Sequence, residues 1–204
     1  MVRRRYLMVG LSSGAVLAAA SVALAAPAPK GGTSIYQGAL STAQKLAVIR
    51  RDAPRLAAKA RIKLPAIHGL QRPVRLSARR LYGGRALMSV YGAASVDAAS
   101  DKINLIAVNT NYRLPAYLNI RFMPDRPGQA VLVDATISSN TRGNATVTAR
   151  RSDGSIDTLP LHGYGAVGHL RLVVVPTRRG WQTVTVKTTS GNVMIQNVEV
   201  TPTH

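Results

Sequence analysis

Residues 181–200 read WQTVTVKTTSGNVMIQNVEV, and this stretch decides the expected fold. In its first half, Val184 and Val186 alternate with polar residues, and a period of two is typical of a strand that buries one face. The second half, residues 193–200, is again rich in β-branched residues. Gly191 stands between the halves, where a turn needs conformational freedom. The stretch therefore predicts two consecutive β-strands.

The same pattern of short β-like runs extends back from this stretch to residue 73. Short β-like runs alternate with turn signals, of which Gly83-Gly84 and Asp153-Gly154 are the clearest. Pro160 interrupts one run and predicts an edge strand or a break. The other expected strands cover residues 74–82, 86–91, 103–109, 116–123, 130–138, 144–151, 155–161 and 169–175. Many short strands without intervening helices predict an all-β fold, an antiparallel β-sandwich of jelly-roll type, preceded by a short basic helical segment.

The end of the chain resembles a known family of sugar-binding domains. A strand that begins Gly180-Trp181-Gln182 is followed, after a glycine turn, by a strand that ends Val198-Glu199-Val200. This order resembles the last two strands of jelly-roll carbohydrate-binding modules, which have a galactose-binding-like fold. The resemblance implies a β-sandwich and a sugar site built from loop aromatics, often with a calcium ion. It spans residues 180–200 without a matching calcium ligand set, so it bears on the fold more than on the activity.

The beginning of the chain has the organisation of an export signal. Three arginines at residues 3–5 precede an apolar stretch over 7–24, and residues 23–25 form a small-x-small cleavage motif. We expect residues 1–25 to be a signal peptide cleaved near Ala25, which leaves a periplasmic or secreted protein without a transmembrane anchor. The alternative is a membrane span, which needs about 20 strongly apolar residues. The arginines also resemble the twin-arginine signal, which leaves the export route open.

Three further regions are expected after the signal. Residues 26–40 contain proline and glycine without apolar periodicity and predict a flexible linker. Residues 41–72 predict the basic helical segment. Residues 73–204 form the expected β-sandwich domain.

The helical segment should contain two short helices. Ser41 and Gln44 have the spacing of a capping box, which predicts a helix start. Pro54 cannot lie deep inside a helix, because it lacks a backbone donor and its ring clashes with the preceding turn. We therefore predict helices over 41–51 and 53–62.

The charge of the chain is strongly positive. Its 204 residues include 27 Lys plus Arg against 8 Asp plus Glu, a formal net charge of +19, and cleavage after residue 25 would remove three arginines and leave +16. Twelve basic residues lie between Lys45 and Arg85, with one acid among them. Such a concentration attracts polyanions, so we expect anionic polysaccharide or lipid headgroups as partners. A solvated basic face is the alternative, and export argues against nucleic acid.

Candidate ligand-binding residues follow from this charge. Arg51, Arg55 and Lys59 are four residues apart and would line one face of a helix. Arg79 and Arg80 lie further along the same basic region. Arginine suits phosphate and carboxylate because its planar fork donates two parallel hydrogen bonds.

The aromatic residues supply a second set of candidates. Tyr112 and Tyr164 lie in predicted loops, where their rings would be free to stack on sugars. Tyr117, Asn119 and Arg121 lie on the polar face of one predicted strand and would form a shallow site. Trp181 is expected to pack in the core, with ligand contact as the alternative.

Catalytic chemistry on sugars would require a pair of carboxylates. Asp97 and Asp101 are four residues apart, and Asp153 and Asp157 flank a predicted turn. Turn and cap roles explain these residues better. Asp134 lies within an apolar strand, where burial would perturb its pKa.

A metal site is a further hypothesis for the glycine-rich segment 161–169. It contains His162 and His169, which would share a metal, with Asp157 as a third ligand. The alternative is a flexible connection with solvated histidines. The chain has no cysteine, which excludes disulfides and thiolate metal sites. The interpretation favoured here has no metal and no cofactor.

Taken together, these patterns favour an exported, non-catalytic binding module for an anionic glycan or envelope surface. Clustered arginines would attract the ligand and loop tyrosines would stack on it. One alternative is a structural or accessory subunit of an envelope assembly that contacts a protein partner through edge strands. A small carbohydrate-active hydrolase is the other alternative, less favoured because no catalytic motif is found.

Overall fold

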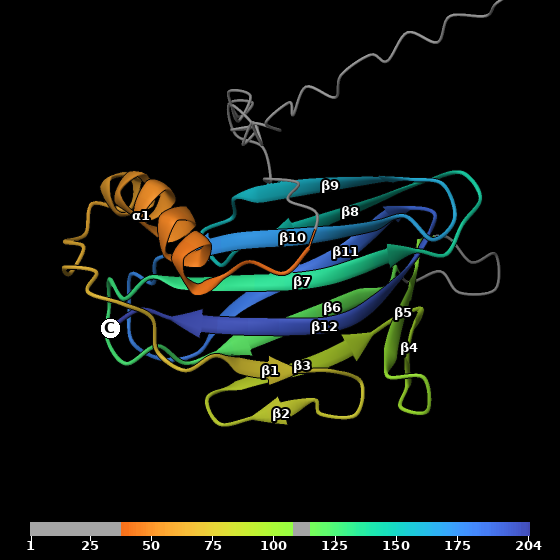
Figure 1. The fold of residues 1–204 in the computed structure, drawn as a ribbon, viewed down its shortest axis with the longest axis horizontal. Helices are drawn as coiled ribbons and strands as arrows, with labels where there is room; N and C mark the ends of the chain where they lie inside the picture. The colour runs from red at the N-terminus through yellow and green to blue at the C-terminus, as the bar shows by residue number, and fades with distance from the viewer. Residues whose placement is uncertain (1–37, 108–114) are drawn as a thin grey trace, which may run out of the picture.

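The computed structural model describes residues 38–107 and 115–204, which form two antiparallel β-sheets packed face to face (Figure 1). The first sheet has the strand order β10 (Val167–Val174), β7 (Val131–Ser139), β12 (Asn192–Pro202), β5 (Lys102–Ile106) and β4 (Ala94–Asp97), with β1 (Val74–Leu76) also paired to β12. The second sheet has the order β2 (Tyr82–Gly83), β3 (Ala86–Tyr91), β6 (Tyr117–Phe122), β11 (Gln182–Ser190), β8 (Asn144–Arg150) and β9 (Ile156–His162). The predicted antiparallel β-sandwich is confirmed.

The main core lies between the two sheets and follows from the alternation of each strand. Val184 and Val186 of β11 are completely buried, whereas Thr183 and Lys187, on either side of them, face outward. The first sheet contributes apolar side chains such as Ile137 of β7 to the same core. Burying an aliphatic side chain of this size contributes about 1.5–3 kcal/mol, so the alternating valines and isoleucines are the main source of stability.

One helix, α1 (Thr42–Lys59), packs on the outer face of the first sheet, against β10 and β7 (Figure 1). The predicted capping box is confirmed, because Ser41 and Gln44 each bond to the backbone of the other. The prediction of two helices is wrong. The helix runs through Pro54, because Ile49 and Ala53 are buried against the sheet and this packing compensates for the hydrogen bond that proline cannot donate.

Two of the predicted turns and the predicted edge strand are confirmed. Gly84 and Gly154 both have positive φ, at the β2–β3 turn and the β8–β9 turn. Strand β9, which contains Pro160, forms the edge of the second sheet. A proline is tolerated there because an edge strand has one unpaired side.

The structure differs from the predicted strands in two places. The run 74–82 is not one strand, because β1 pairs with β12 in the first sheet and only Tyr82-Gly83 pairs with β3. Strand β4 was not predicted. The two consecutive strands predicted over 181–188 and 193–200 are confirmed as β11 and β12, and Gly191 joins them from one sheet to the other.

The signal peptide over 1–25, most of the linker over 26–40 and the candidate Tyr112 lie outside the described residues. Among the residues that are described, no helix is long and apolar enough to cross a membrane.

Candidate functional site

The outer face of the second sheet carries a group of aromatic and cationic side chains. Neither α1 nor another described element packs on this face, since α1 contacts the first sheet. The residues that define it, called the aromatic face below, are Tyr82, Tyr91, Tyr117, Asn119, Arg121, Trp181 and Lys187. The sandwich core lies on the other side of the same strands, so the face is held on a rigid support.

Strand register places these side chains next to one another. Tyr91 of β3 is directly opposite Tyr117 of β6, and Tyr117 is directly opposite Lys187 of β11. In the neighbouring row, Asn119 lies opposite Thr185, whose hydroxyl donates a 2.8 Å hydrogen bond to the Asn119 amide oxygen. Cross-strand neighbours on one face have Cβ atoms about 4.5–5.5 Å apart, so the row forms a continuous surface.

Cations cover part of the aromatic surface. The Arg121 guanidinium lies 5.3 Å from the centroid of the Trp181 ring, and the Lys187 ammonium lies 5.8 Å from that of Tyr117. The attraction between a cation and the face of a ring holds these long side chains against the sheet. Tyr91 is 55% exposed, so its ring remains available for stacking.

The expected core role of Trp181 is wrong. Its ring is 37% exposed and packs under Arg121 on the outside of the sheet. The reason is its position directly before Gln182, which points inward and is buried. Alternation therefore turns Trp181 outward.

Of the predicted site residues, the three on β6 lie together on the aromatic face, and the others that the structure describes lie elsewhere. Tyr117, Asn119 and Arg121 lie side by side on β6. Tyr164 is 71% exposed, in the β9–β10 connection away from the aromatic face. Arg79 is tied down locally, since its guanidinium donates to the carbonyl oxygens of Ala98 and Ala99.

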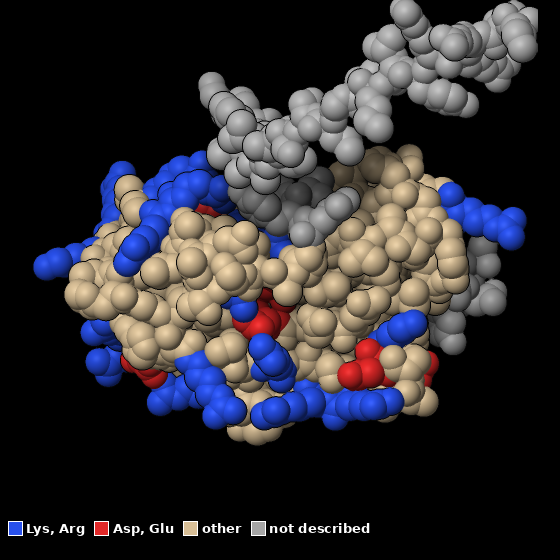
Figure 2. All heavy atoms as spheres, in the orientation of Figure 1, with Lys and Arg blue, Asp and Glu red and all other residues tan. Residues whose placement is uncertain are grey.

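Basic side chains gather over α1 and along the edge formed by β1 and β2 (Figure 2). The expected clustering is thus divided between two regions of the surface. Part of the charge is also neutralised within the chain. Five of the twelve residues pair with acids: Lys45 and Arg75 with Glu199, Arg51 and Arg55 with Asp52, and Arg85 with Asp125. Lys59 is exposed at the end of α1.

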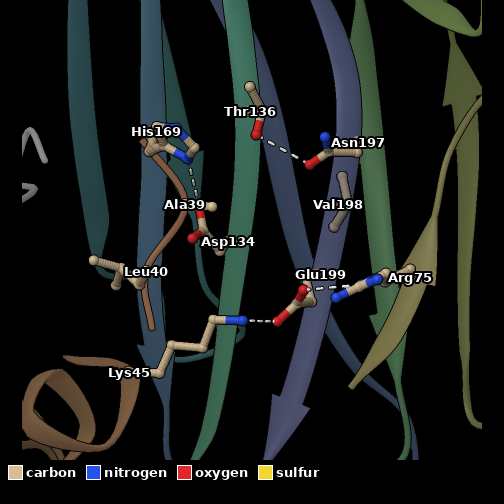
Figure 3. Close-up of a pocket in the computed structure, with 10 residues that line it drawn as sticks. All are labelled: Ala39, Leu40, Lys45, Arg75, Asp134, Thr136, His169, Asn197, Val198 and Glu199. Atoms are coloured by element: carbon tan, nitrogen blue, oxygen red, sulfur yellow. Dashed lines mark hydrogen bonds and ion pairs between the residues drawn. The ribbon is translucent and has the colours of Figure 1, made fainter. Parts of the chain in front are cut away.

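A pocket of about 300 Å³ lies on the opposite side of the molecule, between the first sheet and the start of α1 (Figure 3). A row of charged side chains crosses four neighbouring strands here, and the last three of them line the pocket: Arg171, Asp134, Glu199 and Arg75. Lys45 of α1 reaches over the sheet to Glu199. The expected burial of Asp134 is confirmed, since this residue is 8% exposed.

Every charge in this row has a partner of opposite sign. Asp134 accepts a 3.1 Å hydrogen bond from Nε of Arg171, and its other oxygen lies 3.1 Å from Nδ1 of His169. Burial raises the pKa of Glu199, but the hydrogen bond and charge of Lys45, with smaller contributions from Thr201 and Arg75, outweigh it and lower the pKa overall. The row fastens α1 to the sheet.

Replacing Glu199 with glutamine is expected to lower the free energy of unfolding at pH 7 by about 1–2 kcal/mol, because Lys45 and Arg75 lose their ionic partner. Since the pKa of Glu199 is lowered in the fold, its contribution is complete above the unfolded value of 4.5 and disappears as the pH falls through the folded value. Urea unfolding at neutral and at strongly acidic pH measures this. Equal differences between wild type and variant at both pH values would contradict it.

The metal hypothesis for the two histidines is not supported. His162 pairs with Asn144 in the second sheet, and His169 pairs with Asp134 in the first. Within residues 38–107 and 115–204, no group of three His, Asp or Glu side chains is placed to hold a metal ion. Asp157, the third proposed ligand, forms an ion pair with Arg151.

The carboxylate pairs considered from the sequence serve local structure. Hydrogen bonds from Ser100 lower the pKa of Asp97, and the backbone amide of Arg79 lowers that of Asp101. Asp153 accepts from the backbone and hydroxyl of Ser155. Burial raises the pKa of Asp157, with the charge of Arg151 opposing it. Asp157 does not line any of the pockets described here.

Comparison with known proteins gives a similarity of fold. No protein-family model matches the chain, and no curated protein matches its sequence. Similar solved structures include a CBM36 carbohydrate-binding module in complex with calcium and xylotriose, with 14% identity, a TM-score of 0.39, and 62% of this chain and 98% of that one covered. A family 35 carbohydrate-binding module from Clostridium thermocellum has 14% identity, a TM-score of 0.38, and coverages of 64% and 98%.

A family two carbohydrate esterase from Cellvibrio japonicus is also similar, with 11% identity and a TM-score of 0.41. That match covers 65% of this chain but spans only 35% of the esterase. The expected weak resemblance to jelly-roll carbohydrate-binding modules is confirmed. At these scores it assigns no ligand to this chain.

Proposed function

We propose that this protein is an exported, non-catalytic glycan-binding protein that holds an acidic polysaccharide on the aromatic face. The single observation that carries the proposal is the row Tyr91–Tyr117–Lys187, in which two rings and a cation lie side by side on a sheet face that no described helix or strand covers. Tyrosine rings bind the CH surfaces of sugars, and cations bind their carboxylate or sulfate groups. Export follows from the signal expected over residues 1–25.

The chemistry of the face supports an extended and acidic ligand. Aromatic side chains reach from Tyr82 at the edge of the sheet, 64% exposed, to the half-buried Tyr117 in its interior. Arg121 and Lys187 are the cations of this surface, and no acidic side chain belongs to it. A neutral sugar would leave both cations without an ionic partner, so an acidic one is favoured.

Lipid headgroups are a less favoured ligand. The exposed cations of α1 would be their contact, but Asp52 pairs with both Arg51 and Arg55 and so reduces the charge of that surface. Assembly through edge strands also has less support. The long edge strand of the second sheet, β9, contains Pro160, and a proline blunts strand addition.

Binding of dextran sulfate and of unmodified dextran tests this function, because the two polymers share a backbone and differ in charge. We expect dextran sulfate to bind more tightly, and its affinity to fall when the Debye length shrinks from about 30 Å at 0.01 M salt to about 8 Å at 0.15 M. Contacts with the rings are screened much less, so a measurable affinity should remain at the higher salt. Equal binding of both polymers, or complete loss of sulfated-polymer binding at 0.15 M, would contradict the proposal.

A further inference from the structure

A groove of about 620 Å³ lies where the edges of the two sheets approach each other, beside β1 and β2. Three arginines line it, Arg72, Arg75 and Arg80, together with Gly83 and Gly84. No acidic residue belongs to its lining. In Figure 2, basic side chains border the molecule along this edge. The groove is separate from the pocket on the first sheet, although Arg75 lines both.

Backbone geometry positions the Arg80 side chain in advance. The backbones of Ser77 and Arg80 exchange two 3.0 Å hydrogen bonds, which close a tight turn directly before β2. The Arg80 guanidinium then lies against Gly83. A Cβ atom at Gly83 would come within 3.3 Å of both Nε and Nη2 of Arg80, so glycine makes room for the cation to lie flat on the strand.

The positive charge of the groove is only partly neutralised. Arg72 and Arg80 are exposed, and neither pairs with a carboxylate of the described chain. Arg75 directs its Nε to Glu199 at 3.3 Å, while its side chain is 77% exposed and still lines the groove. Of the three guanidinium groups, only that of Arg75 therefore has a carboxylate partner among the described residues, and this carboxylate also binds Lys45.

We propose that this groove binds a phosphate group carried by the glycan ligand. A phosphate monoester has a charge of about −1.5 to −2 at pH 7 and three terminal oxygens, which match three arginine forks better than the single charge and two oxygens of a carboxylate. A volume of about 620 Å³ also accommodates the sugar unit that would carry the phosphate. The inference deepens the proposed function and rests on it for the nature of the carrier, but not for the binding of the anion.

Isothermal titration of the full chain with inorganic phosphate and with glucose 6-phosphate tests the proposal. We expect saturable binding of both, with glucose 6-phosphate binding more tightly because its sugar occupies the rest of the groove. The double variant Arg72→Gln/Arg80→Gln should weaken both affinities by about tenfold or more. The matched control is Arg142→Gln/Arg178→Gln, which removes the same charge from two exposed positions outside the groove and should leave both affinities within about twofold.

Equal weakening in the two double variants would overturn the proposal, because it would mean that phosphate responds to overall charge. Absence of saturable phosphate binding would overturn it as well. Failure of the proposed function would be seen separately, as loss of polysaccharide binding without loss of phosphate binding. The Tyr91→Ala/Tyr117→Ala variant should keep full phosphate affinity, and the groove would bind phosphate even in a chain that retains no polysaccharide. Thermal unfolding of each variant confirms that it is folded, as expected for exposed positions.

Discussion

Replacing Asp134 with alanine is expected to lower the free energy of unfolding by about 3–5 kcal/mol, because the buried guanidinium of Arg171 loses its carboxylate. The Arg171 side chain is 1% exposed, so water cannot take the place of the carboxylate without opening the structure. His169, 3.1 Å from the other oxygen of Asp134, loses a hydrogen-bond partner in the same step. Arg171 also donates to the carbonyl oxygen of Gly38, which holds the chain ahead of α1, so the helix should loosen first.

Chemical denaturation followed by fluorescence measures this effect, since Trp181 is the single tryptophan of the chain. The matched control is Arg85→Ala, which removes an ion pair with Asp125 in which both side chains are exposed to solvent. An exposed pair contributes about 0–1 kcal/mol, so the control should be nearly neutral. The milder Asp134→Asn keeps one acceptor and should fall between the two. A loss below about 1 kcal/mol for Asp134→Ala would show that the buried row is not what fastens α1.

Local patterns were sufficient to predict most strands of this fold. The alternation around Val184 and Val186 fixes which side of β11 is buried, and the glycine turns at Gly84 and Gly154 occur where predicted. Alternation does not say which strand lies next to which. Strands β11 and β12 are consecutive in the chain yet lie in different sheets, because Gly191 connects the sheets instead of closing a hairpin.

The same limit applies to the candidate site. Tyr117, Asn119 and Arg121 could be grouped from sequence because one strand places alternate residues on one face. Tyr91 could not be added to them, since its place opposite Tyr117 depends on the register between β3 and β6. The alternation of buried and outward residues along β11 could have predicted that Trp181 faces outward, because Gln182 next to it faces inward. The residue type suggested burial instead.

Charge counting overestimated the free basic surface. Asp52 and Glu199 each bind two basic side chains, and Glu199 does so across more than a hundred residues of sequence. Such long-range pairing depends on tertiary structure, so the net charge of a segment does not give the charge that a ligand meets.

The double variant Tyr91→Ala/Tyr117→Ala is expected to weaken binding of an acidic oligosaccharide by about tenfold or more. Each exposed ring that stacks on a sugar contributes about 1 kcal/mol, and loss of Tyr117 also removes the support of Lys187. The stability of the chain should change little, because Tyr91 is exposed and Tyr117 lies on the outer side of its strand. Tyr164→Ala is the control, since this tyrosine is the more exposed one but lies outside the aromatic face.

A fluorescence titration with a sulfated oligosaccharide tests the central claim most directly, because Trp181 itself belongs to the aromatic face. We predict a saturable change in Trp181 fluorescence for the wild type, the same affinity for Tyr164→Ala, and an affinity lowered by about tenfold or more for Tyr91→Ala/Tyr117→Ala. If the ligand binds wild type and double variant equally well, or binds without any change at Trp181, the aromatic face is not the glycan site.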